Sequence, residues 1–238
     1  MDSTINEYEE VRVVKVDDRT TVYQKTLRYL YRLFLPLMFS TLILAWALYP
    51  ERYDWRYEYV SDLGGLTSKQ EGLNNIVASR VMSIGFALVA AIALTIAIIY
   101  FINKEVIKWR RIMLGIFNLL ITIGAAGVGI PTKHPVIGRF HQIGAMIFLF
   151  MFAITNMSLQ GTRSRSKFKR RSEEKKTDFT IDITIAALVL FAFLLLCVFY
   201  IVDEWLGIAA LSSSAEVMQK VVLIVDCIAI YRLDVDDM

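Results

Sequence analysis

The sequence predicts an all-α membrane protein, with six transmembrane helices in one bundle. About six apolar runs come close to the ~20 residues that an α-helix needs to cross a bilayer. Of the 238 residues, 56% are hydrophobic, and the 21% that are charged gather between those runs. Lys and Arg are concentrated in alternate connecting segments, all of which fall on one side of the membrane if there are six spans.

The predicted elements follow from the places where polar residues interrupt the apolar runs. A polar tail covers residues 1–28, and the alternation at residues 11–16 (VRVVKV) within it predicts a short strand. The spans are predicted at residues 29–49, 76–102, 112–130, 140–159, 181–202 and 215–231. Residues 29–232 therefore form one membrane domain, which is followed by an acidic tail at residues 233–238.

The predicted orientation follows from the basic residues, which favour the cytoplasmic side of membrane proteins. The N-terminal tail and the loops at residues 103–111 and 160–178 are rich in Lys and Arg, whereas the three alternate loops are poor in them. Both termini are therefore predicted to be cytoplasmic. The first 28 residues are polar and resemble no signal peptide, so the plasma membrane is the expected location.

This topology places several polar residues at the same depth on the outer side. Ser61 and Asp62 fall in the first loop, and Arg80, His141 and Glu216 lie near the starts of the second, fourth and sixth spans. Ionisable groups at membrane depth are costly and normally face the bundle or a wet cavity. We therefore expect these five residues to form an outward-facing polar pocket.

Helical spacing predicts the direction in which two of these side chains point. Arg80 shares a stripe with Ser83 and Ala87, and His141 shares another with Ala145. Small residues at such intervals let membrane helices approach closely. Both Arg80 and His141 are therefore predicted to face the bundle interior.

Each of these residues also fits a purely structural role. Asp62 precedes two glycines and can form a turn, and Glu216 can complete a capping box with Ser213. Arg80 can extend along the helix to the outer interface, and His141 can serve as an interhelical hydrogen-bond partner. The sequence leaves these alternatives open.

Several other kinds of chemistry are not expected. His134 and His141 are seven residues apart rather than the four that place two imidazoles together on a helix, so no metal site is predicted. Cys197 and Cys227 both fall within apolar runs, which argues against a disulfide. No cofactor motif and no nucleic-acid partner is predicted, a membrane lipid is the expected partner, and a homo-oligomer is left open.

Three short motifs resemble those of a known six-span family. Ser61–Gly64 (SDLG) is similar to its S-D-x-G loop, Phe140–Ala145 (FHQIGA) to its fourth-span H-x-x-G-A element, and Ala215–Glu216 to the A-E pair of its prokaryotic branch. The family includes the damage-regulated autophagy modulators, the yeast suppressor-of-four-kinase protein and the GPI-anchor remodelling protein, with prokaryotic relatives of unknown function. The resemblance implies lipid-related membrane biology and supplies no catalytic residues.

The sequence is compatible with three functions. The first is a membrane protein whose outer pocket binds a lipid headgroup or a small polar ligand. The second is a structural or regulatory membrane protein in which the polar cluster locks the helices together. The third is a lipid-modifying enzyme with His141 as general base and Asp62 as the residue that orients it.

Overall fold

The computed structural model describes residues 3–104, 106–132, 137–169, 176–201 and 214–233. Within these ranges the chain forms six α-helices and one short 3-10 helix, without a β-strand. The helices are α1 (Ser3–Ala47), α2 (Ile76–Ile102), α3 (Lys108–Val128), α4 (Gly138–Lys169), α5 (Lys176–Ile201) and α6 (Ser214–Tyr231), and the 3-10 helix is η1 (Val60–Gly64). The predicted all-α class is thereby confirmed.

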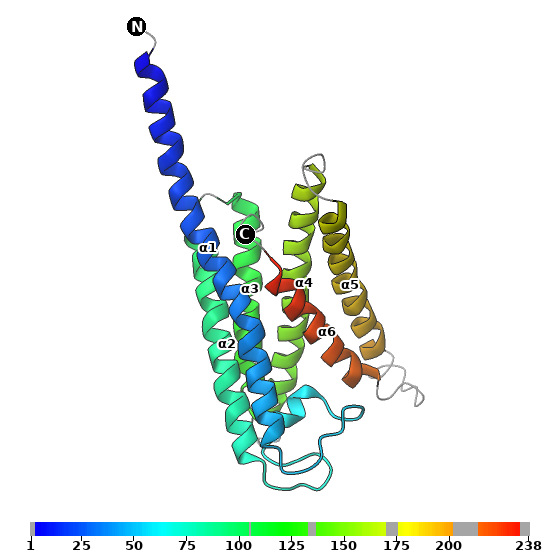
Figure 1. Ribbon diagram of the computed structural model, residues 1–238. Helices are drawn as coiled ribbons and strands as arrows, with labels where there is room; N and C mark the ends of the chain where they lie inside the picture. Colours follow the sequence, from blue (N-terminus) through cyan, green and yellow to red (C-terminus); the bar gives the residue numbers. More distant parts are fainter. Residues whose placement is uncertain (1–2, 105, 133–136, 170–175, 202–213, 234–238) are drawn as a thin grey trace.

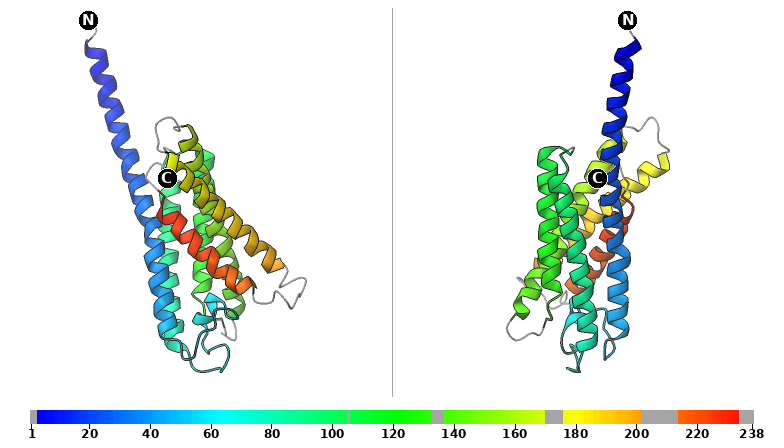
Figure 2. Two further views of the ribbon diagram at one scale, coloured as in Figure 1. Left: turned by 45° about the vertical axis from the view of Figure 1, so that its right-hand side comes forward. Right: turned by 90° about the vertical axis from the view of Figure 1, so that its left-hand side faces the viewer.

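α1, α2, α3 and α4 run along one bundle axis, whereas α6 crosses it obliquely and α5 is inclined beside it (Figures 1 and 2). The long N-terminal part of α1 extends beyond one end of the bundle, and the C-terminal end of α6 lies toward the same end (Figures 1 and 2). The loop between α1 and α2, residues 48–75, covers the opposite end. It lies beside the start of α6, which brings two distant parts of the chain together.

Four of the helices are long and apolar enough to cross a membrane. Among the described residues these segments are Val22–Ala47, Ile76–Ile102, Lys108–Val128 and Arg139–Arg163. α5 contains a shorter apolar stretch, Ile183–Phe199. α6 has 18 residues, a length of ~27 Å, and carries Glu216, Lys220 and Asp226. Composition therefore supports a membrane protein, with four spans evident from the helices themselves.

Two predictions about the polar segments are wrong. Residues 11–16 are helical, since α1 runs without a break from Ser3 to Ala47. A helix that has started gains one hydrogen bond per added residue, whereas an isolated strand has no partner for its backbone. The loop predicted at residues 160–178 is shorter, because α4 continues to Lys169 and α5 begins at Lys176. His134 and residues 202–213 lie outside the described part of the chain.

Aromatic side chains fill the centre of the bundle. Phe34 of α1 packs on Phe152 of α4 with ring centroids 5.5 Å apart, and Phe86 of α2 packs on Phe148 at 5.6 Å. Phe148 and Phe152 stack on each other at 5.6 Å. All four rings are buried, so a single aromatic column connects α1, α2 and α4.

Glycines set the distance between α3 and α4. A Cβ atom built on Gly124 would lie 2.5 Å from the backbone nitrogen of Phe148, and one built on Gly144 would lie 2.5 Å from Gly127 Cα. Both neighbours are backbone atoms that cannot rotate away. The close approach of these two helices therefore requires residues without a side chain, as is common between membrane helices.

We expect Gly144→Ala to destabilise the protein, because the added methyl group must push the two helices apart. Overpacking of this kind costs ~1–3 kcal/mol. The matched control is Gly161→Ala on the same helix, where a Cβ meets nothing within 4 Å. There, the higher helix propensity of Ala predicts unchanged or slightly greater stability. Thermal unfolding in detergent compares the two, and equal midpoints would contradict the prediction.

Candidate functional site

A buried carboxylate organises the loop between α1 and α2. Glu58 is 0% exposed, although it lies in a polar loop. Its carboxylate accepts hydrogen bonds from Tyr49 Oη at 3.1 Å, from the Asp54 backbone nitrogen at 3.2 Å and from Gln70 Nε2 at 2.7 Å. The hydroxyl of Tyr53 donates to the backbone carbonyl of Glu58 at 3.0 Å. These contacts join the two halves of the loop around one side chain.

Lys220 of α6 connects this loop to the helical bundle. Its Nζ atom donates to the carbonyl oxygens of Trp55 at 2.9 Å, Glu58 at 2.5 Å and Glu216 at 3.1 Å. The ring centroids of Tyr53 and Trp55 lie 5.5 and 5.7 Å from the same atom, within the range of cation–π attraction. Three acceptors match the three protons of an ammonium group, so Lys220 is a cation whose hydrogen-bonding capacity is used by backbone carbonyls.

η1 carries the Ser61–Gly64 motif and is held from several sides. Asp62 Oδ2 accepts from the Tyr59 backbone nitrogen at 2.8 Å and forms an ion pair with Lys69 Nζ at 3.1 Å. Gln219 of α6 accepts a hydrogen bond from the Val60 backbone nitrogen at 3.0 Å. Two residues near the start of α2, Asn75 and Ser79, donate to carbonyls of η1 and of the residue that follows it. Asp62 therefore stabilises the turn, as one of the structural alternatives predicted.

His141 is buried at the junction of α3 and α4. It is 1% exposed, and Nδ1 lies 2.5 Å from the carbonyl oxygen of Ile130. Because a carbonyl can only accept, Nδ1 carries a proton in this contact. Nε2 is buried without a hydrogen-bond partner among the described residues. Asp62 lies within electrostatic range of the imidazole, but no hydrogen bond joins His141 to Ser61 or Asp62 in the described part of the chain.

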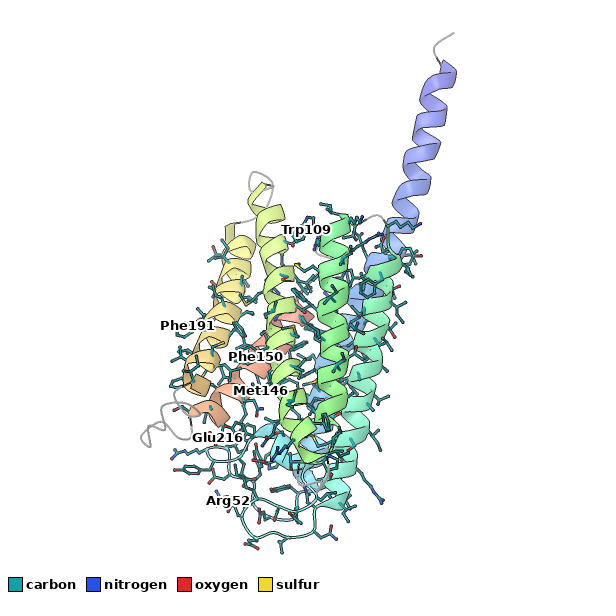
Figure 3. All side chains as sticks on the ribbon, turned by 180° about the vertical axis from the view of Figure 1, so that it is seen from behind. Arg52, Trp109, Met146, Phe150, Phe191 and Glu216 are labelled. Atoms are coloured by element: carbon teal, nitrogen blue, oxygen red, sulfur yellow. The ribbon has the colours of Figure 1, made fainter. Side chains whose placement is uncertain are left out.

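The remaining predicted site residues divide into two groups. Glu216 is 8% exposed, and its carbonyl accepts from Lys220 where α6 begins, beside the loop that carries Arg52 (Figure 3). Ser61 lines a small cavity of about 20 Å³ together with Gln219. Ser61, Asp62, Glu216 and His141 thus lie around the same end of the bundle.

Arg80, in contrast, does not face the bundle. It is exposed on α2, as is Ala87, which was expected to share its interior stripe. The buried stripe of α2 passes instead through Ser79, Met82 and Phe86. At 100° per residue, a face shifted by one position points in a different direction. The prediction that Arg80 points inward is therefore wrong.

A concave space beside these residues is apolar. A groove of about 230 Å³ lies between α1, the loop and α6. Its walls are the following residues: Met38, Phe39, Leu42, Ile43, Trp46, Tyr53, Trp55, Val60, Leu63, Lys220, Leu223 and Ile224. Lys220 is the one charged residue among them, and its ammonium group is bonded to carbonyls. Among the polar side chains described above, Tyr53 and Lys220 line this groove, whereas Glu58, Asp62, Gln219 and His141 are not part of its wall.

Sequence reasoning overlooked two residues that join the loop to α6, namely Lys220 and Gln219. Both occur inside an otherwise apolar run near the C-terminus. An ionisable residue at such a position signals a buried partner, so Lys220 could have been selected by the rule that selected Glu216. Its partners could not, because they are backbone carbonyls. No group of three His, Cys, Asp or Glu side chains that could hold a metal ion occurs among the described residues.

The comparisons with known proteins assign no relative to this chain. No protein-family model, curated protein or solved structure matches it.

Two tyrosines of the loop are held in the protonated form. Burial raises the pKa of Tyr49, and the carboxylate of Glu58 raises it further. Burial likewise raises the pKa of Tyr53, with additional contributions from Asp62 and Glu58. Ionising either phenol would place a negative charge in a partly desolvated site beside carboxylates. Tyr49 therefore remains a hydrogen-bond donor to Glu58.

We expect Lys220→Met to release the loop from α6. The substitution leaves the carbonyls of Trp55 and Glu58 without their donor, and the expected loss in the free energy of unfolding is about 3 kcal/mol. Thermal unfolding and amide hydrogen exchange of residues 48–75 measure the effect. Lys69→Met is the control, because Lys69 is 40% exposed and an ion pair in that environment contributes at most ~1 kcal/mol. Equal effects of the two substitutions would reject the role of Lys220.

We also expect alkaline pH to weaken the loop through Tyr49 and Tyr53. Their folded-state pKa values lie above the value of about 10 in an unfolded chain, so their stabilisation is complete below about pH 10 and is lost as the pH rises through the folded values. When tyrosine ionisation in the native protein is followed by absorbance, the number of phenols that titrate near pH 10 should be the same in the wild type, in Tyr49→Phe and in Tyr53→Phe. Each substitution should remove one ionisation in the denatured protein. If either variant showed one fewer phenol titrating near pH 10 in the native protein, the raised pKa of that tyrosine would be refuted.

Proposed function

We propose that this chain is a six-span plasma-membrane protein that binds an acyl chain of an outer-leaflet phospholipid in the groove between α1 and α6. α5 and α6 supply the fifth and sixth crossings. The lengths of the helices and their alternating direction in Figure 1 support this topology. The segments rich in Lys and Arg belong to one end of the bundle, which supports cytoplasmic termini.

The observation that carries the proposal is the composition of the groove. Its wall offers aliphatic and aromatic surface together with one lysine that is already bonded. Water finds few hydrogen-bond partners in such a space. A hydrocarbon chain that enters it instead gains ~25 cal/mol of free energy for each Å² of apolar surface removed from water. Ile43 and Ile224 on its wall are exposed, so a chain could enter sideways from the lipid phase. The groove therefore suits an acyl chain better than a polar headgroup.

The headgroup would lie at the end of the groove formed by the loop. Trp46 and Trp55 pack edge to face there, with ring centroids 6.0 Å apart. Tryptophan is enriched at the level of the lipid headgroups. Arg52 and Arg56 are exposed in the same loop, and an exposed guanidinium can pair with a phosphate group. These residues favour a phospholipid over an uncharged lipid.

We propose in addition that the chain is a distant member of the six-span family that the Ser61–Gly64 motif resembles. The support is the position of the motif. It lies in η1 at the junction of α2 and α6. The carbonyl of Gly64 accepts a hydrogen bond from Ser79, and the backbone nitrogen of Val60, just before the motif, donates to Gln219.

A second candidate is a structural role for the polar cluster. The three donors of Lys220 are matched by three carbonyls, and Glu58 is surrounded by donors. Such a closed set can lock the loop to the bundle without any ligand. The lipid-modifying enzyme receives less support, because the imidazole of His141 contacts neither Ser61 nor Asp62 through a hydrogen bond.

The test uses a phospholipid that carries a photoreactive diazirine in its acyl chain. We expect saturable labelling of residues 38–46 and 220–224 in the purified protein, suppressed by an excess of unlabelled phosphatidylglycerol. Ile224→Trp fills the groove and should reduce this labelling at least about fivefold, which corresponds to about 1 kcal/mol. Val221→Trp is the matched control on the exposed face of the same helix.

The outcomes separate the two candidates. Labelling that does not saturate, or that Ile224→Trp and Val221→Trp reduce equally, would reject specific lipid binding. If Lys220→Met then still lowers the unfolding temperature, the structural role stands on its own.

A further inference from the structure

A carboxyl group lies in the interior of the bundle, well away from the loop. Asp226 of α6 is 1% exposed and faces Asn156 of α4, which is 0% exposed. Asn156 Nδ2 donates to Asp226 Oδ1 at 2.9 Å and to the Asp226 backbone carbonyl at 3.1 Å. The second carboxyl oxygen, Oδ2, is buried and has no hydrogen-bond partner among the described residues. The proposed lipid site does not use this group.

The cations on neighbouring helices are committed elsewhere. On α4, Arg163 donates to the carbonyl of Arg232, and on α1, Arg32 donates to the carbonyl of Leu233 at 3.1 Å. Both acceptors lie beyond the end of α6, more than one turn from Asp226. Among the described residues, no ion pair involves Asp226.

The other surroundings of Asp226 are neutral. Gln160 of α4 donates to the Ala229 carbonyl at 2.8 Å. From α5, Ala192 and Leu196 pack against α6 at Val222. η1 meets α6 near its opposite end. The titratable group that interacts with Asp226 is its own neighbour, the Cys227 thiol.

This environment favours the neutral acid. An ionised carboxylate needs donors for both oxygens, and a charge buried without them is strongly disfavoured. Here one amide supplies one donor, to Oδ1. A protonated acid fits the same contacts, with Oδ1 as its carbonyl oxygen and the proton on Oδ2. A buried O–H group costs far less than a buried charge.

We propose that Asp226 is a proton-binding site inside the bundle, holding a proton on Oδ2 at neutral pH, and that release of this proton weakens the contact between α4 and α6. The ligand of the site is the proton itself. Ionisation would create a buried negative charge that has a single amide donor. Water that enters between α4 and α6 would solvate this charge and separate the two helices. Leu223 and Ile224 of α6 form part of the groove wall, so release of the proton would also change the groove. An effect on lipid binding rests on the proposed function, whereas the proton site itself does not.

Infrared spectroscopy of the full-length protein in detergent tests the site directly. The wild type should show the carbonyl stretch of a protonated carboxylic acid at neutral pH, and Asp226→Asn should lack it. Asp62→Asn is the control, because Asp62 is ion-paired with Lys69, and this substitution should leave the band unchanged. If Asp226→Asn instead removes a carboxylate band at neutral pH, the proposal is overturned.

A second variant and a stability measurement keep the test decisive. Asn156→Leu removes the donor that serves the ionised form, so the acid band should persist to a pH at least about one unit higher than in the wild type. The melting temperature of the wild type should fall as the pH rises through this titration, while that of Asp226→Asn should not follow it. If Asp226→Asn does not fold, the Asn156→Leu titration decides alone, and an unshifted midpoint rejects the proposal.

Discussion

The buried ammonium group of Lys220 is the contact on which the arrangement of the loop depends. Its three protons meet carbonyls of Trp55, Glu58 and Glu216, two from the loop and one from the preceding turn of α6. A cation buried in this way is retained only while its donors are matched, because leaving it unpaired costs several kcal/mol. The same contacts place the Trp55 ring at the end of the groove. The hydrogen bonds of Lys220 therefore help to set the shape of the groove.

α6 is held by polar contacts along its whole length. Lys220 and Gln219 bind the loop at one end, and Asn156 and Gln160 of α4 bind the middle and far part of the helix. Between helices in a membrane, lipid competes for apolar surface, so polar contacts and close packing determine which helices associate. This explains why α6, which carries Glu216, Lys220 and Asp226 in its apolar run, is also well buried along one face. Its oblique path in Figure 1 brings both sets of partners within reach.

The predicted polar pocket stays a prediction, whereas the helical face chosen for Arg80 is wrong. Ser61, Asp62 and Glu216 lie at one end of the bundle because the alternating directions of the helices bring the loop after α1 and the start of α6 to the same end. Helical spacing shows which residues of α2 share a stripe, but the packing of the neighbouring helices decides which stripe is buried. Arg80 belongs to a stripe that the neighbouring helices leave exposed. The stripe through Ser79 and Met82 faces them instead.

The sequence alone determined the all-α class and the positions of the apolar helices, because both depend on local length and composition. The tertiary structure decided which of these residues touch. Lys220 binds backbone carbonyls that every residue possesses, and Asp226 meets Asn156 across 70 residues of chain. Such pairings leave no trace in local sequence, since they depend on the packing of α6 against the loop and α4.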